Sequence, residues 1–218
     1  MNLRFLGHAA FYLVTADGTR IVTDPYEPGG FGGAIGYGPI PDPADVVTIS
    51  HQHADHNHVK SVPGSPVVLS SVGEYTEKGV TFRGLTTFHD TKQGAERGGN
   101  IVWSIEADGL RICHLGDLGA TLAAEEVGHL GPIDVLLIPV GGTFTLDARG
   151  ATEVMNALKP RLALPMHYRT PKVKLNIAYV DDFLADKRNV ERVKGSDLTV
   201  TTGTLPKTTA IIVLEPAL

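Results

Sequence analysis

The sequence predicts an α/β fold in which two β-sheets pack face to face and helices cover their outer sides, an αββα sandwich. Strand-like apolar runs dominate the first half of the chain, and the second half mixes such runs with helical patterns. Strands followed by helices, twice along the chain, suit two sheets with helices outside. The 218 residues suffice for one large core and show no long linker or internal repeat, so we expect a single domain over residues 1–218.

The strands of the first half are marked by short apolar runs between turn signals. Asp17-Gly18 is one such signal, and Asp108-Gly109 predicts a hairpin between the runs on either side of it. The strands expected in this half cover residues 3–6, 11–14, 21–23, 46–50, 67–70, 80–88, 101–105 and 110–114.

The second half alternates helical patterns with apolar runs. Residues 121–130, 147–158 and 181–188 are expected to be helical; Thr145 or Asp147 can cap the second of these helices, and Lys159-Pro160 ends it. Residues 133–140 form a continuous apolar run, which is typical of a strand buried on both faces. A final strand is expected at residues 209–214.

Composition favours an ordinary globular protein and excludes several classes. Hydrophobic residues make up 42% and charged residues 20% of the chain, and the net charge of −5 gives no general attraction to nucleic acid. The sequence lacks an apolar run of about 18 residues, so no membrane span is expected. Its first residues lack the pattern of a signal peptide, so we expect a cytoplasmic protein.

The segment 50–56, Ser-His-Gln-His-Ala-Asp-His, follows an apolar run and concentrates potential metal ligands. His51 and His53 are two residues apart, so on extended chain they point the same way, whereas Asp55 and His56 come after the turn and can face a second ion. Imidazole and carboxylate are good ligands for zinc and similar ions. Isolated histidines are usually surface or packed residues, but four potential ligands at one strand end would be costly to desolvate without a partner. The segment therefore predicts a two-metal site.

The motif His-x-His-x-Asp-His resembles the signature of the metallo-β-lactamase superfamily. The later motifs of that family also have counterparts, in the expected order along the chain. His89 follows the strand expected at residues 80–88, Asp117 lies in a Gly-Asp step after the hairpin, and His167 closes the apolar run 162–166. The resemblance implies a metallo-β-lactamase-type αββα sandwich.

The resemblance also implies a ligand set. In the family pattern, one ion is held by His51, His53 and His89, the other by Asp55, His56 and His167, and Asp117 bridges them. A water or hydroxide between the ions is the nucleophile, because coordination lowers its pKa toward neutrality. Asp55 can also orient that water or accept its proton. Zinc is the expected metal, and the ligands also accommodate manganese, iron or nickel.

Further motifs narrow the resemblance within the superfamily. Gly7-His8-Ala9, Thr23-Asp24-Pro25 and the step from His114 to Asp117 are similar to the branch that contains ascorbate-6-phosphate lactonases. This branch implies hydrolysis of an ester, lactone or phosphodiester bond in a small molecule, and its members can be homo-oligomers. The alternatives are a nuclease-type phosphodiesterase and a non-catalytic metal-binding or sensing protein. The acidic charge argues against the first, and the complete ligand set against the second.

Four residues outside the ligand set are candidates for the site. His8 and His114 are expected to orient ligands or to donate a proton to a leaving group, the alternative being packed histidines bonded to backbone. Tyr168 and Arg169 adjoin His167 and are expected to bind substrate; arginine suits a carboxylate or phosphate, so the substrate is expected to be anionic. Cys113 alternates with His114 and is interpreted as a small buried hydrophobe.

Three loops are candidates for the rim of the site, since loops on a rigid scaffold commonly carry substrate contacts. Residues 27–43 are rich in Gly and Pro and could form a lid or an interface. Residues 90–100 follow His89 and carry Lys92, Glu96 and Arg97, and residues 170–179 follow His167. A solvated connection is the alternative for each loop.

Overall fold

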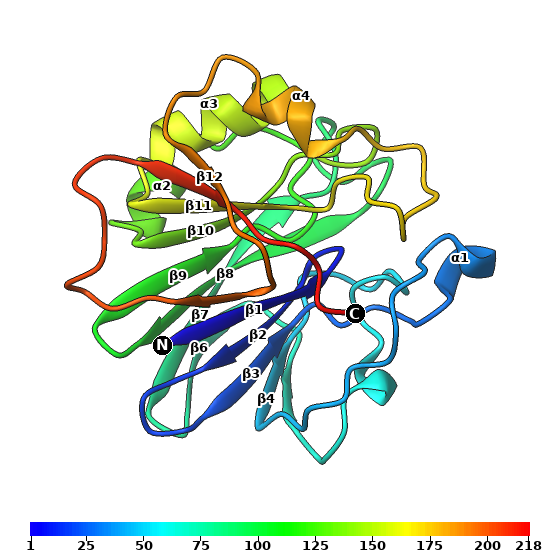
Figure 1. The fold of residues 1–218 in the computed structure, drawn as a ribbon, viewed down its shortest axis with the longest axis vertical. Helices are drawn as coiled ribbons and strands as arrows, with labels where there is room; N and C mark the ends of the chain where they lie inside the picture. The colour runs from blue at the N-terminus through cyan, green and yellow to red at the C-terminus, as the bar shows by residue number, and fades with distance from the viewer.

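The computed structural model describes residues 1–218, and its strands form two sheets that face each other (Figure 1). The first sheet has the strand order β13-β1-β2-β3-β4-β5. Its strands are β1 (Asn2–Gly7), β2 (Ala10–Val14), β3 (Arg20–Thr23), β4 (Val46–Thr48), β5 (Val67–Leu69) and β13 (Asp197–Thr199). The second sheet has the order β12-β14-β11-β10-β9-β8-β7-β6. Its strands are β6 (Gly73–Glu77), β7 (Val80–Phe88), β8 (Gly99–Ala107), β9 (Leu110–His114), β10 (Val135–Pro139), β11 (Leu162–Met166), β12 (Val190–Arg192) and β14 (Ala210–Val213).

The longer helices lie on the outer side of the eight-stranded sheet (Figure 1). They are α2 (Ala124–Leu130), α3 (Ala148–Leu158) and α4 (Val180–Leu184). By contrast, α1 (Gly30–Gly33) and the 3₁₀ helix η1 (Val59–Ser61) are single turns. None of the helices has the length and apolar character that a membrane crossing requires.

Side-chain alternation in the first sheet separates two cores. On β2, Phe11 and Leu13 point into the large core between the sheets, whereas Ala10 and Tyr12 point to the opposite face. That outer face is covered by the segment 26–44, which packs Ile35 and other buried side chains onto it. The predicted sandwich is confirmed, with one correction: the outer layer over the first sheet is mostly irregular chain rather than helix.

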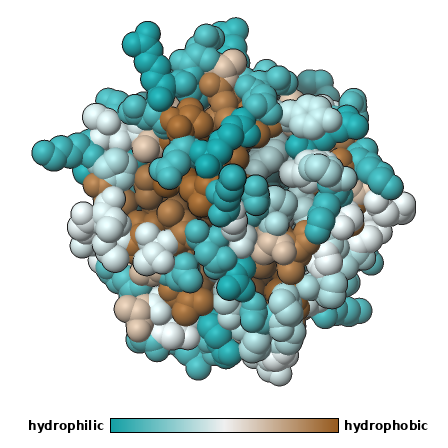
Figure 2. Space-filling view, in the orientation of Figure 1, coloured by the Kyte–Doolittle hydropathy of each residue, from teal (hydrophilic) through white to brown (hydrophobic).

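The hydrophobic interior is partly visible from the side. In the space-filling view, hydrophobic side chains show between hydrophilic ones, most plainly in the left half of the molecule (Figure 2).

Most expected elements are confirmed, among them the hairpin of β8 and β9 that Asp108-Gly109 predicted. Asp108 and Gly109 have φ of 55° and 72°, the left-handed conformations that a tight two-residue hairpin turn requires. Asp147 caps α3, since its carboxylate accepts a hydrogen bond from the Gly150 amide at 2.7 Å. The helices α2 and α4 are shorter than expected. The short strands β6, β12 and β13 were not expected, because they are largely exposed and lack an apolar alternation.

Candidate metal centre

The seven expected ligands come together at one edge of the sandwich, where strands of both sheets end. The parallel pair β3 and β4 directs its carboxyl ends to this edge, and so do the parallel strands β9, β10 and β11. The site residues follow these strands or β1 and β7 directly, in the order His8, Asp24, His51, His53, Asp55, His56, His89, Asp117 and His167.

Asp117 lies at the centre of the cluster. Its Oδ2 atom is 3.2 Å from Nε2 of His56 and 3.2 Å from Nε2 of His89. The same oxygen is 3.4 Å from Nε2 of His167 and 3.8 Å from Nε2 of His51. One carboxylate oxygen therefore faces four imidazoles.

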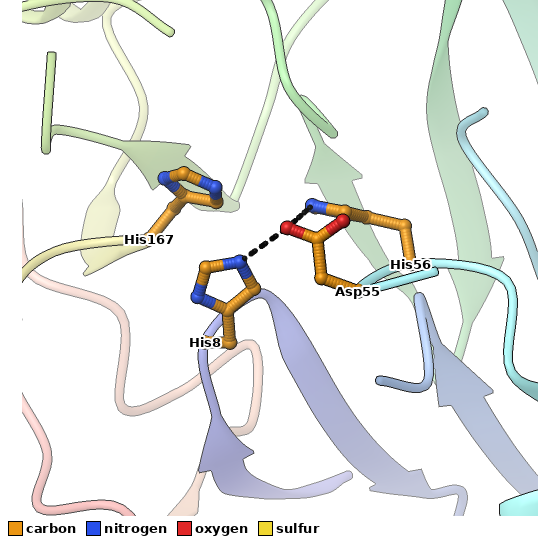
Figure 3. A group of neighbouring side chains, drawn as sticks. All are labelled: His8, Asp55, His56 and His167. Atoms are coloured by element: carbon orange, nitrogen blue, oxygen red, sulfur yellow. Dashed lines mark hydrogen bonds and ion pairs between the residues drawn. The ribbon is translucent and has the colours of Figure 1, made fainter. Parts of the chain in front are cut away.

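The ligand atoms fall into two main groups, and within each group they lie within 4.8 Å of one another. One group contains His51, His53 and His89. The other contains Asp55, His56 and His167, and His8 joins it (Figure 3). These groups coincide with the two ligand sets that the family resemblance implies, with His8 as an addition. A third group overlaps both and adds Asp24 to His51 and His56.

The donor set fits a divalent metal. Oδ1 of Asp117 and Nε2 of His56 are buried without a hydrogen-bond partner. Buried polar atoms that lack a partner are costly, and coordination to a cation would satisfy them. Several imidazoles with a few carboxylates match the preferences of zinc and of neighbouring transition metals.

The electrostatics of the cluster also favour a cation. Burial lowers the pKa of His51 and of His167 to about 3, so both imidazoles are neutral and able to coordinate at neutral pH. Burial opposes ionisation of Asp117, but the imidazoles of His167 and His56 lower its pKa well below the usual value. Burial would lower the pKa of His56, yet Asp117 and Asp55 raise it well above normal. The two carboxylates thus favour a protonated His56. A bound metal ion would supply the positive charge in place of that proton.

Asp24 orients His56 from the side of the ring that faces away from Asp117, a role that the sequence did not predict. Its buried carboxylate accepts hydrogen bonds from Ser50, at 2.7 Å from the amide and 2.5 Å from the hydroxyl. It also lies 2.8 Å from Nδ1 of His56, which leaves Nε2 of that ring facing Asp117. The Ser50 hydroxyl lies 2.9 Å from Nδ1 of His51. The local signals were the place of Asp24 at the end of a buried strand and the Thr23-Asp24-Pro25 motif, and neither of them indicated this role.

His8 supports Asp55 and His167. Its Nε2 lies 3.0 Å from Oδ2 of Asp55 (Figure 3), and its ring centroid is 4.1 Å from that of His167. The backbone carbonyl of His8 accepts a hydrogen bond from the His167 amide at 2.7 Å. His8 is buried and does not line the adjacent pocket, so its geometry suits the orienting role rather than proton donation to a leaving group.

His114 does not reach the site with a free nitrogen. Its Nε2 lies 2.8 Å from the Ala9 carbonyl, and its Nδ1 accepts a hydrogen bond from the Gly116 amide at 3.1 Å. Because both ring nitrogens are engaged by backbone, the expected role as a proton donor is not supported. His114 instead holds the turn that presents Asp117, and burial lowers its pKa. Cys113, beside it, is buried as expected, and burial raises its pKa to about 12.

Three site residues have left-handed backbone conformations. The φ angles of His8, Asp24 and His167 are 54°, 40° and 52°. Such conformations are unfavourable for residues other than glycine and persist where surrounding contacts enforce them. Here the enforcing contacts include the hydrogen bond from His167 to His8 and one from the Asp24 amide to the Thr48 carbonyl at 2.9 Å.

A pocket of about 230 Å³ opens directly onto the cluster. It is lined by Phe31, His53, Asp55, His89, Arg97, Asp117, Phe144, His167 and Leu175. Two larger hollows, beside Arg111, contain none of the cluster residues. This pocket and an adjoining polar hollow lined by His51, His53 and Arg97 both reach the cluster.

Tyr168 and Arg169 do not line this pocket, contrary to expectation. Tyr168 is buried in the large core, and its hydroxyl donates to the Leu214 carbonyl at 3.3 Å. The guanidinium of Arg169 lies over the ring of Tyr179, 5.5 Å from its centroid. The arginine in the pocket is Arg97, from the loop 90–100.

Comparison with known proteins agrees with this architecture. Residues 2–167 match the family model described as the beta-lactamase superfamily domain. A UPF0173 metal-dependent hydrolase from Thermococcus onnurineus is 31% identical over 224 residues, covering 91% of this chain and 98% of that protein. Another, from Methanoculleus marisnigri, is 32% identical and covers 88% of this chain and 89% of its own length.

A solved structure extends the match to three dimensions. The crystal structure of a candidate Zn-dependent hydrolase of the metallo-β-lactamase superfamily from Thermotoga maritima has a TM-score of 0.80 and 41% identity, over 98% of both chains. The present chain therefore belongs to the metallo-β-lactamase superfamily, and within it to the UPF0173 metal-dependent hydrolases.

Proposed function

We propose that this enzyme uses two divalent metal ions to cleave an ester, lactone or phosphodiester bond in a small anionic molecule. The strongest support for two ions is Asp117, whose single Oδ2 atom faces His51 and His89 of one ligand group and His56 and His167 of the other. A carboxylate in that place can bridge two cations. The pocket of about 230 Å³ adjoins a polar hollow of about 380 Å³ along His53 and Arg97, and together they have room for a small molecule.

The assignment follows the two groups. His51, His53 and His89 would hold one ion, Asp55, His56 and His167 the other, and Asp117 would bridge them. Zinc is the expected metal, with manganese, iron and nickel as candidates. Bound there, such ions lower the pKa of a coordinated water and polarise a carbonyl or phosphoryl oxygen of the substrate.

The chain's own residues prepare the site for that reaction. Asp24 fixes the ring of His56, and His8 holds the carboxylate of Asp55 at the pocket wall. Asp55 is placed to orient a water or to accept its proton. The side chains of Phe31 and Phe144 form apolar parts of the pocket wall, beside the ligand side chains.

Metal content tests the proposal directly. Plasma mass spectrometry should find about two ions per chain in the wild type, and Asp117→Ala should lose at least one of them. The matched control is Asp182→Ala, because Asp182 is exposed on α4 and lies outside the pocket. In Asp117→Ala, hydrolysis of p-nitrophenyl acetate and bis(p-nitrophenyl) phosphate should fall together with the metal content. Unchanged metal content in Asp117→Ala, or fewer than two ions in the supplemented wild type, would refute the bridged site.

A further inference from the structure

Arg97 is a cation at the pocket that no carboxylate of the chain neutralises. Its side chain lines the pocket together with ligands of both metal groups. On the same loop, Lys92 forms an ion pair with Glu96 at 2.6 Å, whereas Arg97 forms none with any carboxylate. The positive charge of Arg97 is therefore available to a ligand.

The loop fixes Arg97 relative to the cluster. The carboxylate of Asp90, the residue after His89, accepts backbone hydrogen bonds from the amides of Lys92, Gly94, Glu96 and Arg97 at 2.7, 2.9, 3.0 and 2.8 Å. The His89 amide also donates to the Gly98 carbonyl at 3.1 Å. The backbone of Arg97 is thereby tied to the residue that carries a predicted ligand.

The guanidinium is also oriented. It lies over the ring of Phe144, 4.9 Å from the centroid, and its Nη2 lies 3.4 Å from the Thr143 carbonyl. Stacking restrains the planar group, and most of its five N–H donors remain free for an acceptor. A stacked, unpaired guanidinium is well suited to a carboxylate or phosphate group.

The other residues of the pocket wall indicate the chemical character of the part of the ligand that does not contact Arg97. Apart from Arg97 and the metal-binding side chains, the lining consists of Phe31, Phe144 and Leu175. Phe31 is 54% exposed, so an apolar ligand would remove apolar surface from water there. Arg97 and His53 also line an adjoining polar hollow, so these two residues lie between the two hollows.

We propose that Arg97 is the anion-binding residue of the substrate pocket. The substrate then carries a carboxylate or phosphate group, separate from the bond that is cleaved, on a small apolar body that packs against Phe31, Phe144 and Leu175. The identity of the pocket as the reaction site rests on the proposed function; the binding of the anion to Arg97 is measurable by itself.

Three small probes test the inference by NMR titration: phenylacetate, phenyl phosphate and the neutral phenylacetamide. Each is titrated into metal-loaded and into chelator-treated protein, because anions also bind metal ions. Arg97→Gln removes the charge, and Arg97→Lys restores it without the planar fork. Arg149→Gln is the matched control, since Arg149 is exposed on α3 and does not line the pocket. Circular dichroism and metal content confirm that the variants are folded and loaded.

In wild type and in Arg149→Gln, at least one anion should bind more tightly than phenylacetamide. Arg97→Gln should weaken that anion about tenfold and leave phenylacetamide unchanged, with partial recovery in Arg97→Lys. The tighter of the two anions identifies the substrate group as carboxylate or phosphate. Equal anion binding by wild type and Arg97→Gln, or equal weakening of phenylacetamide, would overturn the inference. If metal content departs from two ions while Arg97 still governs anion binding, the proposed function fails and the anion site stands.

Discussion

Nδ1 of His56 lies 2.8 Å from a carboxylate oxygen of Asp24, and neither side chain is exposed to solvent. The two residues are far apart in sequence and meet because β3 pairs in parallel with β4, which aligns Thr23 with Thr48. This alignment sets the direction in which the imidazole presents its other nitrogen.

Replacing Asp24 by Asn should weaken metal binding without removing a predicted ligand. The amide keeps the shape of the side chain but loses the charge that orients His56. A carboxylate behind a ligating histidine typically contributes about 10–100-fold to metal affinity or activity. Competition with a chromogenic chelator measures the change. Asp182→Asn is the control, because Asp182 is exposed on α4 and lies outside the cluster; an equal loss in both variants would contradict the assigned role.

Gly119 should not tolerate a side chain. A Cβ atom there would lie 2.3 Å from the carbonyl carbon of His89 and 2.5 Å from the amide nitrogen of Asp90. Because these neighbours are backbone atoms, Gly119→Ala should destabilise the protein by about 1–3 kcal/mol and displace His89. In α2, Gly128 has open space around its Cβ position, so Gly128→Ala should stabilise by about 0.5–1 kcal/mol. Urea unfolding checks both signs.

Removal of the Asp90 carboxylate should loosen the loop that carries Arg97. Burial alone would raise the pKa of Asp90, but the four backbone donors lower it to about 2, so the group is ionised at neutral pH. In Asp90→Ala, hydrogen exchange at the amides of Lys92, Gly94, Glu96 and Arg97 should accelerate. Exchange elsewhere, and in Asp182→Ala, should match the wild type. Unchanged protection of these amides would show that the loop has another anchor.

Asp45 should contribute stability only above acidic pH. Nε of Arg20 donates a hydrogen bond to Oδ2 of Asp45 at 2.9 Å. This hydrogen bond holds the pKa of Asp45 well below its usual value. A group whose pKa is depressed by folding stabilises the native state above its unfolded pKa, about 3.9, and this contribution disappears as the pH falls toward the folded pKa. Asp45→Asn should therefore lower Tm at pH 7 by about 2–4 °C. Thermal melts at lower pH should show the difference shrinking below pH of about 4; a constant difference would rule out this ion pair as the cause.

The sequence predicted the parts of the site that are encoded locally. His51, His53, Asp55 and His56 lie within one short segment, and each remaining ligand directly follows a recognisable strand. The hairpin before Asp117 was predictable for the same reason, since Asp108-Gly109 defines the turn.

The remainder depends on tertiary contacts. The role of Asp24 requires the pairing of β3 with β4, which no local pattern reveals. Arg169 was expected in the pocket because it is close to His167 in sequence, but its side chain lies over Tyr179. The pocket arginine is Arg97, on the loop 90–100 that the sequence indicated as a candidate for the rim, but its anchoring by Asp90 was not predicted. Likewise, the contact between the His114 ring and the Ala9 carbonyl joins residues far apart in sequence, and no local pattern indicates it.

The segment 26–44 contributes both to a hydrophobic core and to the pocket. Its buried residues, including Ile35, Tyr37 and Ile40, complete the core on the outer face of the first sheet. Its glycine-rich turn presents Phe31 to the pocket, more than half exposed. Substitutions in the turn can therefore change the shape of the pocket near Phe31 without disturbing the buried residues of the segment. The range of molecules that fit the pocket can thus change during evolution with little loss of folding stability.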